Sequence, residues 1–261
     1  MRPSLSLILP EIDIPGVTIG VTTRDGGVGK APFDTLNLGD HVGDNPAHVR
    51  ENRRRLQSVL PEQPICWLRQ VHGNRTVLAD HTDCSEADAH WTTQRRTPLA
   101  ILTADCLPVV IAAKDASCVG IAHAGWRGAC GGVLEATINR MCKAGAARDN
   151  ITAVIGPCIR QHSYQVGDDL RDEALASTDE AVVFFATDQE PGKYRFDLAG
   201  YVAMRLATGG IAAIHDCQRD TYSESEQFFS HRFATHAGDS DSGRLISVIA
   251  LQPFSTTMQE T

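Results

Sequence analysis

Short apolar runs separated by polar turns recur along most of the chain, and they predict its β-strands. β-Branched and aliphatic residues gather in runs bounded by glycine, proline or acidic residues, which is the pattern of buried strands. These runs predict strands at 16–23, 65–68, 76–79, 98–104, 107–113, 118–124, 151–157, 181–186, 211–216 and 244–251.

Other stretches place apolar residues at helical spacing. In the stretch 44–60, Asn45 is a suitable N-cap and Pro46 suits the first helical position. The same spacing predicts helices at 131–145, 167–177 and 197–210. Because the predicted strands both adjoin one another and alternate with helices, we expect an α/β or α+β class with mixed sheets covered by helices.

Composition narrows the class of protein. The chain has 261 residues, enough for a large core, and it contains no internal repeat or long linker, so we expect one domain spanning 1–261. Its formal net charge of −8 gives no overall positive potential to attract nucleic acid or anionic lipid. No apolar run approaches the roughly 20 residues of a membrane span. Local arginines or backbone amides must therefore hold any anionic ligand.

Cysteine usage and the first residues indicate a cytoplasmic protein. Eight cysteines are scattered through the chain without a Cys-x-x-Cys pair, which indicates reduced thiols and not a disulfide framework. The segment 1–13 has one arginine and a short apolar run, but it lacks the small-residue cleavage site of a secretory signal.

Three residues able to bind a metal each lie at the end of a predicted strand. His72, Cys106 and His123 are separated by 34 and 17 residues, too far apart for the paired ligands of a zinc finger. Two imidazoles and one thiolate, contributed by three strand ends, would leave a fourth position open for water or substrate, as catalytic Zn²⁺ sites do. Copper could bind the same donors. Asp105 is expected to support a ligand by accepting its N–H.

Two arginines on glycine-rich segments are candidates for binding an anion. Arg127 lies in "HAGWRGACGG", where a helix beginning near Gly128 would direct its first amides towards His123. Arg24 lies on the loop "TTRDGGVG" after a predicted strand, which matches no nucleotide-binding fingerprint. Either arginine could instead pair with a surface carboxylate, and Trp126 is expected to pack in the core.

A set of short motifs extends across nearly the whole chain. In order they read "TRDGGVG", "LNLGDHVGD", "RQVHG", "LTADCLPVV", "AHAGWRG", "IGPCI" and "FSHR". This ordered set resembles the bacterial laccase-domain family, also described as polyphenol oxidase-like proteins, purine nucleoside phosphorylases and the peptidoglycan editing factor. The resemblance implies a single laccase-domain-like catalytic domain with four layers, α/β/β/α.

The resemblance also implies which residues act. The family's zinc ligands correspond to His72, Cys106 and His123. Substrate binding is expected from four residues around this site: Arg24, Gln70, Asp105 and Arg127. The implied reaction is zinc-dependent phosphorolysis of adenosine or inosine by inorganic phosphate, with adenosine deamination as a companion activity.

Several alternatives remain open at this point. The same site could hydrolyse an amide and remove a wrongly incorporated amino acid from a nucleotide-linked peptidoglycan precursor. A metal-free hydrolase could use Cys106 as nucleophile and a histidine as base. A zinc site closed by a fourth cysteine would indicate a binding protein. A copper polyphenol oxidase is disfavoured, because multicopper sites need many histidines and this chain has ten, with no His-x-His pair.

Overall fold

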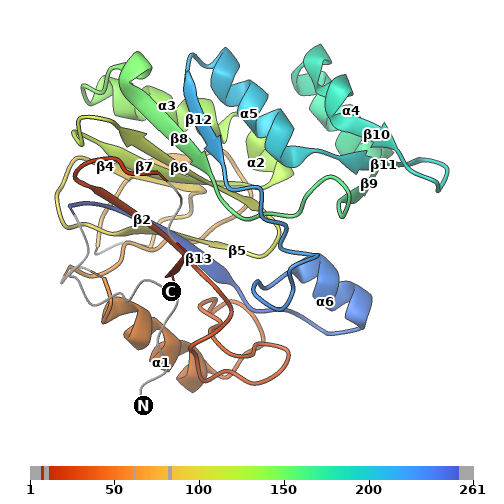
Figure 1. The fold of residues 1–261 in the computed structure, drawn as a ribbon, viewed down its shortest axis with the longest axis horizontal. Coiled ribbons are helices and arrows are strands. Elements are labelled where there is room, and N and C mark those ends of the chain that lie inside the picture. Colours follow the sequence, from red (N-terminus) through yellow and green to blue (C-terminus); the bar gives the residue numbers. More distant parts are fainter. Residues whose placement is uncertain (1–6, 9–11, 61–62, 82–83, 253–261) are drawn as a thin grey trace.

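Two β-sheets lie face to face in this protein. The computed structural model describes residues 7–8, 12–60, 63–81 and 84–252. Most of the N-terminal segment 1–13, considered above as a possible leader, lies outside the described residues. Helices cover the outer face of each sheet, so the order of layers is α/β/β/α, as the resemblance implies (Figure 1).

The larger sheet is mixed and has six strands in the order β12-β8-β6-β7-β4-β3. Its central strands β6 and β7 are antiparallel and buried throughout, while β12 is parallel to β8 and β3 is parallel to β4. The strands are β3 (Thr76–Leu78), β4 (Ala89–Thr92), β6 (Leu107–Ala113), β7 (Val119–Ala124), β8 (Ile151–Ile155) and β12 (Ala213–Asp216).

The second sheet has four strands in the order β1-β2-β13-β5, all antiparallel to their neighbours. Its strands are β1 (Leu7–Ile8), β2 (Val17–Thr22), β5 (Leu99–Thr103) and β13 (Leu245–Leu251). A smaller three-stranded sheet contains β9 (Gln165–Gly167), β10 (Phe185–Thr187) and β11 (Lys193–Phe196).

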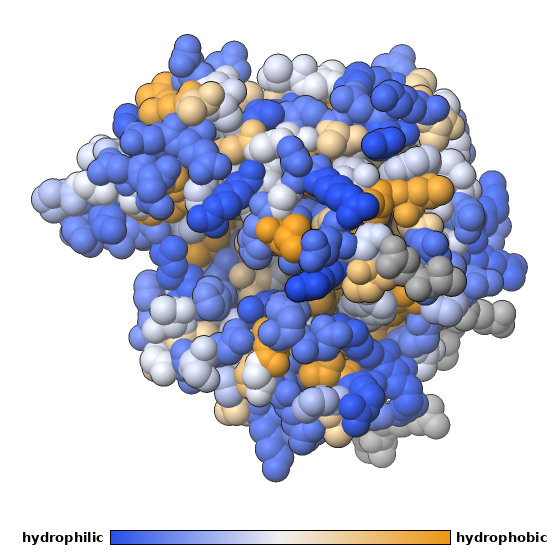
Figure 2. All heavy atoms as spheres, turned by 180° about the vertical axis from the view of Figure 1, so that it is seen from behind, coloured by the Kyte–Doolittle hydropathy of each residue, from blue (hydrophilic) through white to orange (hydrophobic). Residues whose placement is uncertain are grey.

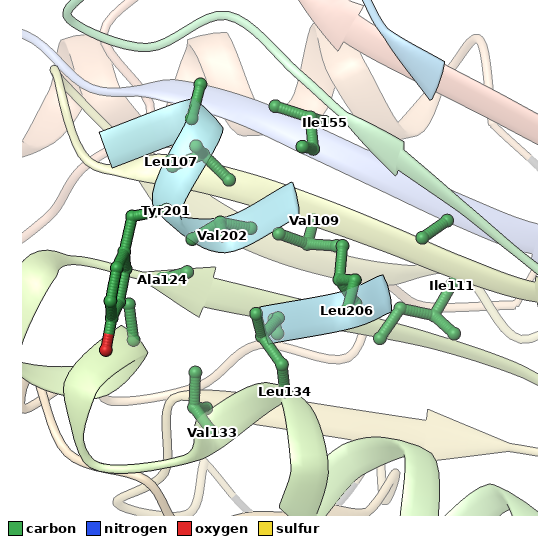
Figure 3. Close-up of a cluster of buried hydrophobic side chains, with 14 of the residues drawn as sticks. Leu107, Val109, Ile111, Ala124, Val133, Leu134, Ile155, Tyr201, Val202 and Leu206 are labelled. Atoms are coloured by element: carbon green, nitrogen blue, oxygen red, sulfur yellow. The ribbon is translucent and has the colours of Figure 1, made fainter. Parts of the chain in front are cut away.

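Apolar side chains fill each space between the layers. Alternate residues of β6 point to opposite faces of the sheet. Val109 belongs to the core between the six-stranded sheet and the helices that cover it, called here the core under the helices. Val110 belongs to the core between the two sheets. Figure 3 shows how Leu107 and Val109 of β6 lie beside Tyr201 and Val202 of α5 (Leu198–Thr208). On the opposite side, α1 (Pro46–Gln57) packs on the four-stranded sheet through Leu56.

The remaining helices are short. They are α2 (Trp126–Cys130), α3 (Val133–Lys143), α4 (Asp168–Ser177) and α6 (His231–Ala237), with 3-10 turns at Arg148–Asn150 and Asp179–Phe184. Within the described residues, no helix combines the length and the hydrophobicity needed to cross a membrane. Figure 2 shows that the face behind Figure 1 is mainly hydrophilic, with apolar residues in small separate patches and a hollow near its middle.

Most predicted elements are present, with ends within a few residues of the prediction. Asn45 caps α1 by accepting the N–H of Ala47, and Pro46 occupies its first turn, both as predicted. The strand predicted at 65–68 is reduced to one isolated bridge, between Cys66 and Leu99.

The strand predicted at 181–186 is also largely wrong. Its first four residues form the 3-10 turn Asp179–Phe184, and only Phe185 and Ala186 belong to β10. Ala181 of this turn is fully buried, whereas Val182 and Val183 are exposed, so only part of this apolar run packs into the core.

Candidate metal centre

Three side chains from distant parts of the sequence meet at the ends of β6 and β7. Cys106 directly precedes β6, and His123 is the penultimate residue of β7. The two strands are antiparallel neighbours with Leu107 opposite Ala124, which places Cys106 close to His123. His72 comes from the loop before β3. The donor atoms of these three side chains all lie within 4.8 Å of one another, so the structure brings together the residues that the sequence singles out.

The buried carboxylate of Asp88 holds two of the three residues. Nδ1 of His123 lies 2.8 Å from Oδ1 of Asp88, and the backbone N–H of His123 donates to the carbonyl of Asp88 over 2.7 Å. The same carboxylate accepts the backbone N–H groups of Val71, His72 and Gly73 at 3.2, 2.9 and 2.7 Å. Because Nδ1 of His123 is engaged, its Nε2 remains as the donor for a metal.

Asp88 therefore takes the supporting role that the sequence predicts for Asp105. The carboxylate of Asp105 accepts the Thr221 hydroxyl at 2.7 Å and the backbone N–H of Arg232 at 2.6 Å, so the prediction that it supports a histidine is wrong. Asp105 also has a φ of 86°, in the left-handed region, directly before Cys106. Its contacts fix the turn that presents the thiol.

Asp88 carries no clear signal in the sequence, because β4, the strand that follows it, lacks an uninterrupted apolar run. The segment "ADAHWT" contains two large polar or amphipathic residues, His90 and Trp91, which interrupt the apolar run. An acidic residue directly before a strand is a weak signal by itself. In the structure the side chain of Asp88 is 0% exposed, and that burial marks it as a structural partner of the centre.

Charge pairing favours the thiolate at Cys106. Burial alone would raise the pKa of this thiol, but the charge of His123 and hydrogen bonds from His123 and His72 lower the pKa of Cys106 below its usual value. Burial would lower the pKa of His123, whereas Cys106 and Asp88 together raise it. The thiolate is the form of cysteine that binds metals.

Gly125 provides the space in which the candidate ligands approach one another. A Cβ atom at this position would lie 3.2 Å from Sγ of Cys106, 3.2 Å from Cδ2 of His72 and 3.7 Å from Cε1 of His123. Gly125 is the N-cap of α2, which therefore begins at Trp126, two residues before the start predicted near Gly128. α2 is separate from α3.

The donor set fits a metal ion with an open coordination position. Catalytic zinc sites take three protein ligands of these types, whereas structural sites are closed by a fourth. In the part of the chain that the structure describes, this is the one group of at least three histidine, cysteine or acidic residues with such closely spaced donor atoms, and no fourth cysteine joins it.

The two arginines expected near the site have different surroundings. Nε of Arg24 donates to the carbonyl of Asp34 at 2.8 Å and Nη1 to that of Ser225 at 2.7 Å, while Nη2 lies 3.1 Å from the Asp34 carboxylate. These contacts use all three guanidinium nitrogens. Arg127 instead is exposed, with its guanidinium carbon 4.2 Å from the centroid of the Trp126 ring. Within the described residues its guanidinium pairs with no carboxylate.

Gln70 binds to the protein backbone. Its side-chain Nε2 donates to the carbonyl of Leu102 at 2.8 Å, and its Oε1 accepts the N–H of Leu102 at 2.7 Å. Leu102 belongs to β5, so Gln70 attaches the His72 loop to the edge of the four-stranded sheet. The packing prediction for Trp126 is confirmed, since its partly buried ring packs against the core under the helices.

Among the described residues, the α/β/β/α layers carry a histidine–cysteine–histidine group that could hold a metal ion. The sequence model of the family described as multi-copper polyphenol oxidoreductase laccase matches residues 18–252. The chain therefore belongs to this family, as its motifs indicate.

Curated relatives share most of their length with this chain. It is 41% identical over 250 residues to the purine nucleoside phosphorylase YfiH of Escherichia coli K12, covering 94% of this chain and 98% of the relative. It is 40% identical over 232 residues to the purine nucleoside phosphorylase PA4543 of Pseudomonas aeruginosa, covering 89% and 92%.

Solved structures share the fold. Protein NMB0706 of Neisseria meningitidis superposes with a TM-score of 0.86 at 33% identity, covering 95% of this chain and 99% of its own. The hypothetical protein YfiH of Bacillus licheniformis superposes with a TM-score of 0.87 at 30% identity, covering 97% and 98%. The fold class predicted from the sequence is thereby confirmed.

Proposed function

We propose that this protein is a zinc-dependent purine nucleoside phosphorylase whose metal is held by His72, Cys106 and His123. The observation that carries the proposal is the grouping of their donor atoms within 4.8 Å of one another. The names of the curated relatives support the reaction class. Inorganic phosphate would cleave the bond between ribose and base in inosine or adenosine, and hydrolytic deamination of adenosine would be a companion activity.

The residues around the centre suit this role. When bound, zinc would polarise an oxygen atom placed at its open coordination position. Asp88 fixes the ring of His123 so that Nε2 is directed to the ligand group, and its bonds to the backbone hold the loop of His72. Cys106 is favoured as the thiolate that a metal requires.

Zinc is preferred to copper because of the number of donors. A multicopper oxidase holds several ions with many histidines, whereas the described residues contain a single group of two histidines and one cysteine. Such a group matches the three-ligand pattern of catalytic zinc.

The four residues expected to bind substrate divide into two roles. Arg127 lies close to Gly125 and pairs with no carboxylate that the structure describes, and we assign it to the attraction of the anionic substrate. Arg24, Gln70 and Asp105 spend their polar atoms on backbone or side-chain partners, and we assign them to positioning the loops around the centre.

The chain as a whole is proposed to act as one catalytic domain, spanning 1–261, in the cytoplasm. The strands of the six-stranded sheet contribute to the cores on both of its faces, which favours a single folding unit. All eight cysteines are free thiols, which suits a reducing compartment.

The test is a phosphorolysis assay on the zinc-loaded full chain with inosine and adenosine. We expect release of hypoxanthine and adenine that requires phosphate and is lost when the metal is chelated. No phosphate-dependent release of base at any pH would overturn the proposal. Activity that survives complete metal removal but is lost on alkylation of Cys106 would support a metal-free thiol enzyme. Cleavage of an amide in a nucleotide-linked cell-wall precursor, without phosphorolysis, would support the editing amidase.

A further inference from the structure

Besides Arg127, Arg232 also lies near the candidate metal centre, because a hydrogen bond links it to the segment that carries Cys106. Arg232 is the second residue of α6, and its backbone N–H donates to the Asp105 carboxylate over 2.6 Å. Since Asp105 directly precedes Cys106, this bond fixes the start of α6 beside the candidate metal centre. The guanidinium carbon of Arg232 lies 5.5 Å from the centroid of the Tyr164 ring.

The guanidinium of Arg232 uses only one of its nitrogens in a hydrogen bond to the described residues. One of its guanidinium nitrogens, Nη1, donates to the carbonyl of Gln165 at 2.9 Å. As with Arg127, no carboxylate among the described residues pairs with this guanidinium. In a chain of net charge −8, two arginines without acidic partners beside one centre form a local cationic surface.

Tyr164 adds a neutral hydroxyl to this surface. Its ring is held against Phe196, with 6.0 Å between the ring centroids. Burial raises the pKa of Tyr164 well above its usual range; the charges of Cys106 and Asp105 raise it further, while Arg232 and Arg127 oppose them. The hydroxyl therefore keeps its proton and can donate a hydrogen bond. No described residue forms a hydrogen bond with it.

We propose that Arg127, Tyr164 and Arg232 form a wall that binds a phosphate-type oxyanion beside the candidate metal centre. Guanidinium groups donate paired hydrogen bonds that match the oxygens of phosphate, and a protonated phenol adds a further donor. Arg24, whose guanidinium nitrogens already have protein partners, is not part of this wall. The inference rests on the proposed function, which requires a bound phosphate group.

The oxyanion has two possible sources that share this chemistry. It is either inorganic phosphate, the co-substrate of phosphorolysis, or a phosphate group carried by a nucleotide substrate. The two sources are tested by two calorimetric titrations of the zinc-loaded full chain. One titration uses inorganic phosphate alone as the probe, and the other uses adenosine monophosphate. Neither titration depends on turnover.

The informative variants are Arg232→Met and Tyr164→Phe. Loss of the charge-assisted bonds of Arg232 should weaken binding of one of the two probes by about tenfold or more, and loss of the Tyr164 hydroxyl should weaken it by roughly threefold. The matched control is Arg171→Met, because Arg171 makes the same kind of contact, 4.8 Å above the ring of Tyr194. This control should bind both probes as the wild type does, and all variants should retain the metal.

The pattern of results decides the proposal. Weaker binding of inorganic phosphate supports the wall as the co-substrate site, and weaker binding of adenosine monophosphate alone supports it as a site for a phosphate of the substrate. Unchanged binding of both probes in Arg232→Met and Tyr164→Phe overturns it. If the wild type shows no phosphorolysis but Arg232→Met still weakens binding, the proposed function fails and the wall stands.

Discussion

The loop after β2 and the junction of β7 with α2 look alike in sequence but differ in what their arginines do. Both place an arginine among glycines directly after a buried strand, as "TTRDGG" and "AGWRGAC". In the loop, Arg24 is bound by Asp34 and by the carbonyl of Ser225. At the junction, Arg127 stacks on Trp126, and no hydrogen-bond partner of its guanidinium lies among the described residues.

The comparison shows that residue type and local motif do not establish a ligand-binding role. An arginine can bind an anion only if the fold leaves its guanidinium without a partner, and the partners come from distant segments. The Ser225 carbonyl that occupies Arg24 is 201 residues away in sequence. Changes in the loop should therefore affect stability, whereas changes at the junction should affect metal or anion binding.

Asp88, the acid that supports the junction, should give the largest effect. Asp88→Asn weakens the bond to Nδ1 of His123 and the bonds to the loop of His72, so we expect zinc affinity to fall by about 10–100-fold. Competition for zinc between the protein and a chelator measures this affinity. The matched loop variant, Asp34→Asn, should leave zinc affinity unchanged, and equal losses in the two variants would break the comparison.

Two glycines offer the next test. At Gly125 a Cβ atom would lie 3.2 Å from the side chains of Cys106 and His72, so Gly125→Ala should lower zinc affinity severalfold. At Gly27 in the loop it would lie 2.0 Å from the backbone carbonyl oxygen of Thr35, so Gly27→Ala should destabilise the fold by about 1–3 kcal/mol.

Chelator competition and urea unfolding of both glycine variants measure these effects. The loop variant should keep its zinc affinity wherever it is folded. If Gly125→Ala were less stable than Gly27→Ala and bound zinc normally, the assignment of the two regions would be reversed.

The two arginines themselves should give effects no larger than those of the two glycines. Arg24→Met leaves two backbone carbonyls without their donor, so we expect a loss of about 1–3 kcal/mol in the free energy of unfolding. Since the guanidinium of Arg127 makes no hydrogen bond within the described part of the chain, Arg127→Met should leave stability the same, while the KM for phosphate should rise severalfold. Thermal melts and steady-state kinetics separate the two, and a rise in KM confined to Arg24→Met would contradict the account.

The sequence predicts strands well where one local signal decides them, and it singles out the three residues whose donor atoms the structure brings together. The uninterrupted apolar runs of β6 and β7 predict both strands closely, and Cys106 and His123 stand at the ends of these runs, whereas His72 lies on the loop before β3. The prediction of a strand at 181–186 fails, because an apolar run this short does not distinguish a strand from a turn.

The supporting residues of the centre are not predictable in this way. The role of Asp88 depends on β4 lying beside β7, which is a tertiary pairing that no local pattern contains. The position of Arg232 beside the centre depends on α6 being fixed to Asp105, 127 residues away in sequence. Such roles depend on contacts between residues far apart in the sequence, so they can be recognised only in the structure.

The metal content of the purified protein tests the central claim most directly. Elemental analysis should find about one zinc ion per chain in the wild type, since three ligands with an open position hold a single ion. It should find almost none in Cys106→Ser, with the circular dichroism spectrum unchanged. A Cys106→Ser protein that retains the zinc of the wild type would contradict the account, because the metal would then be held by other residues.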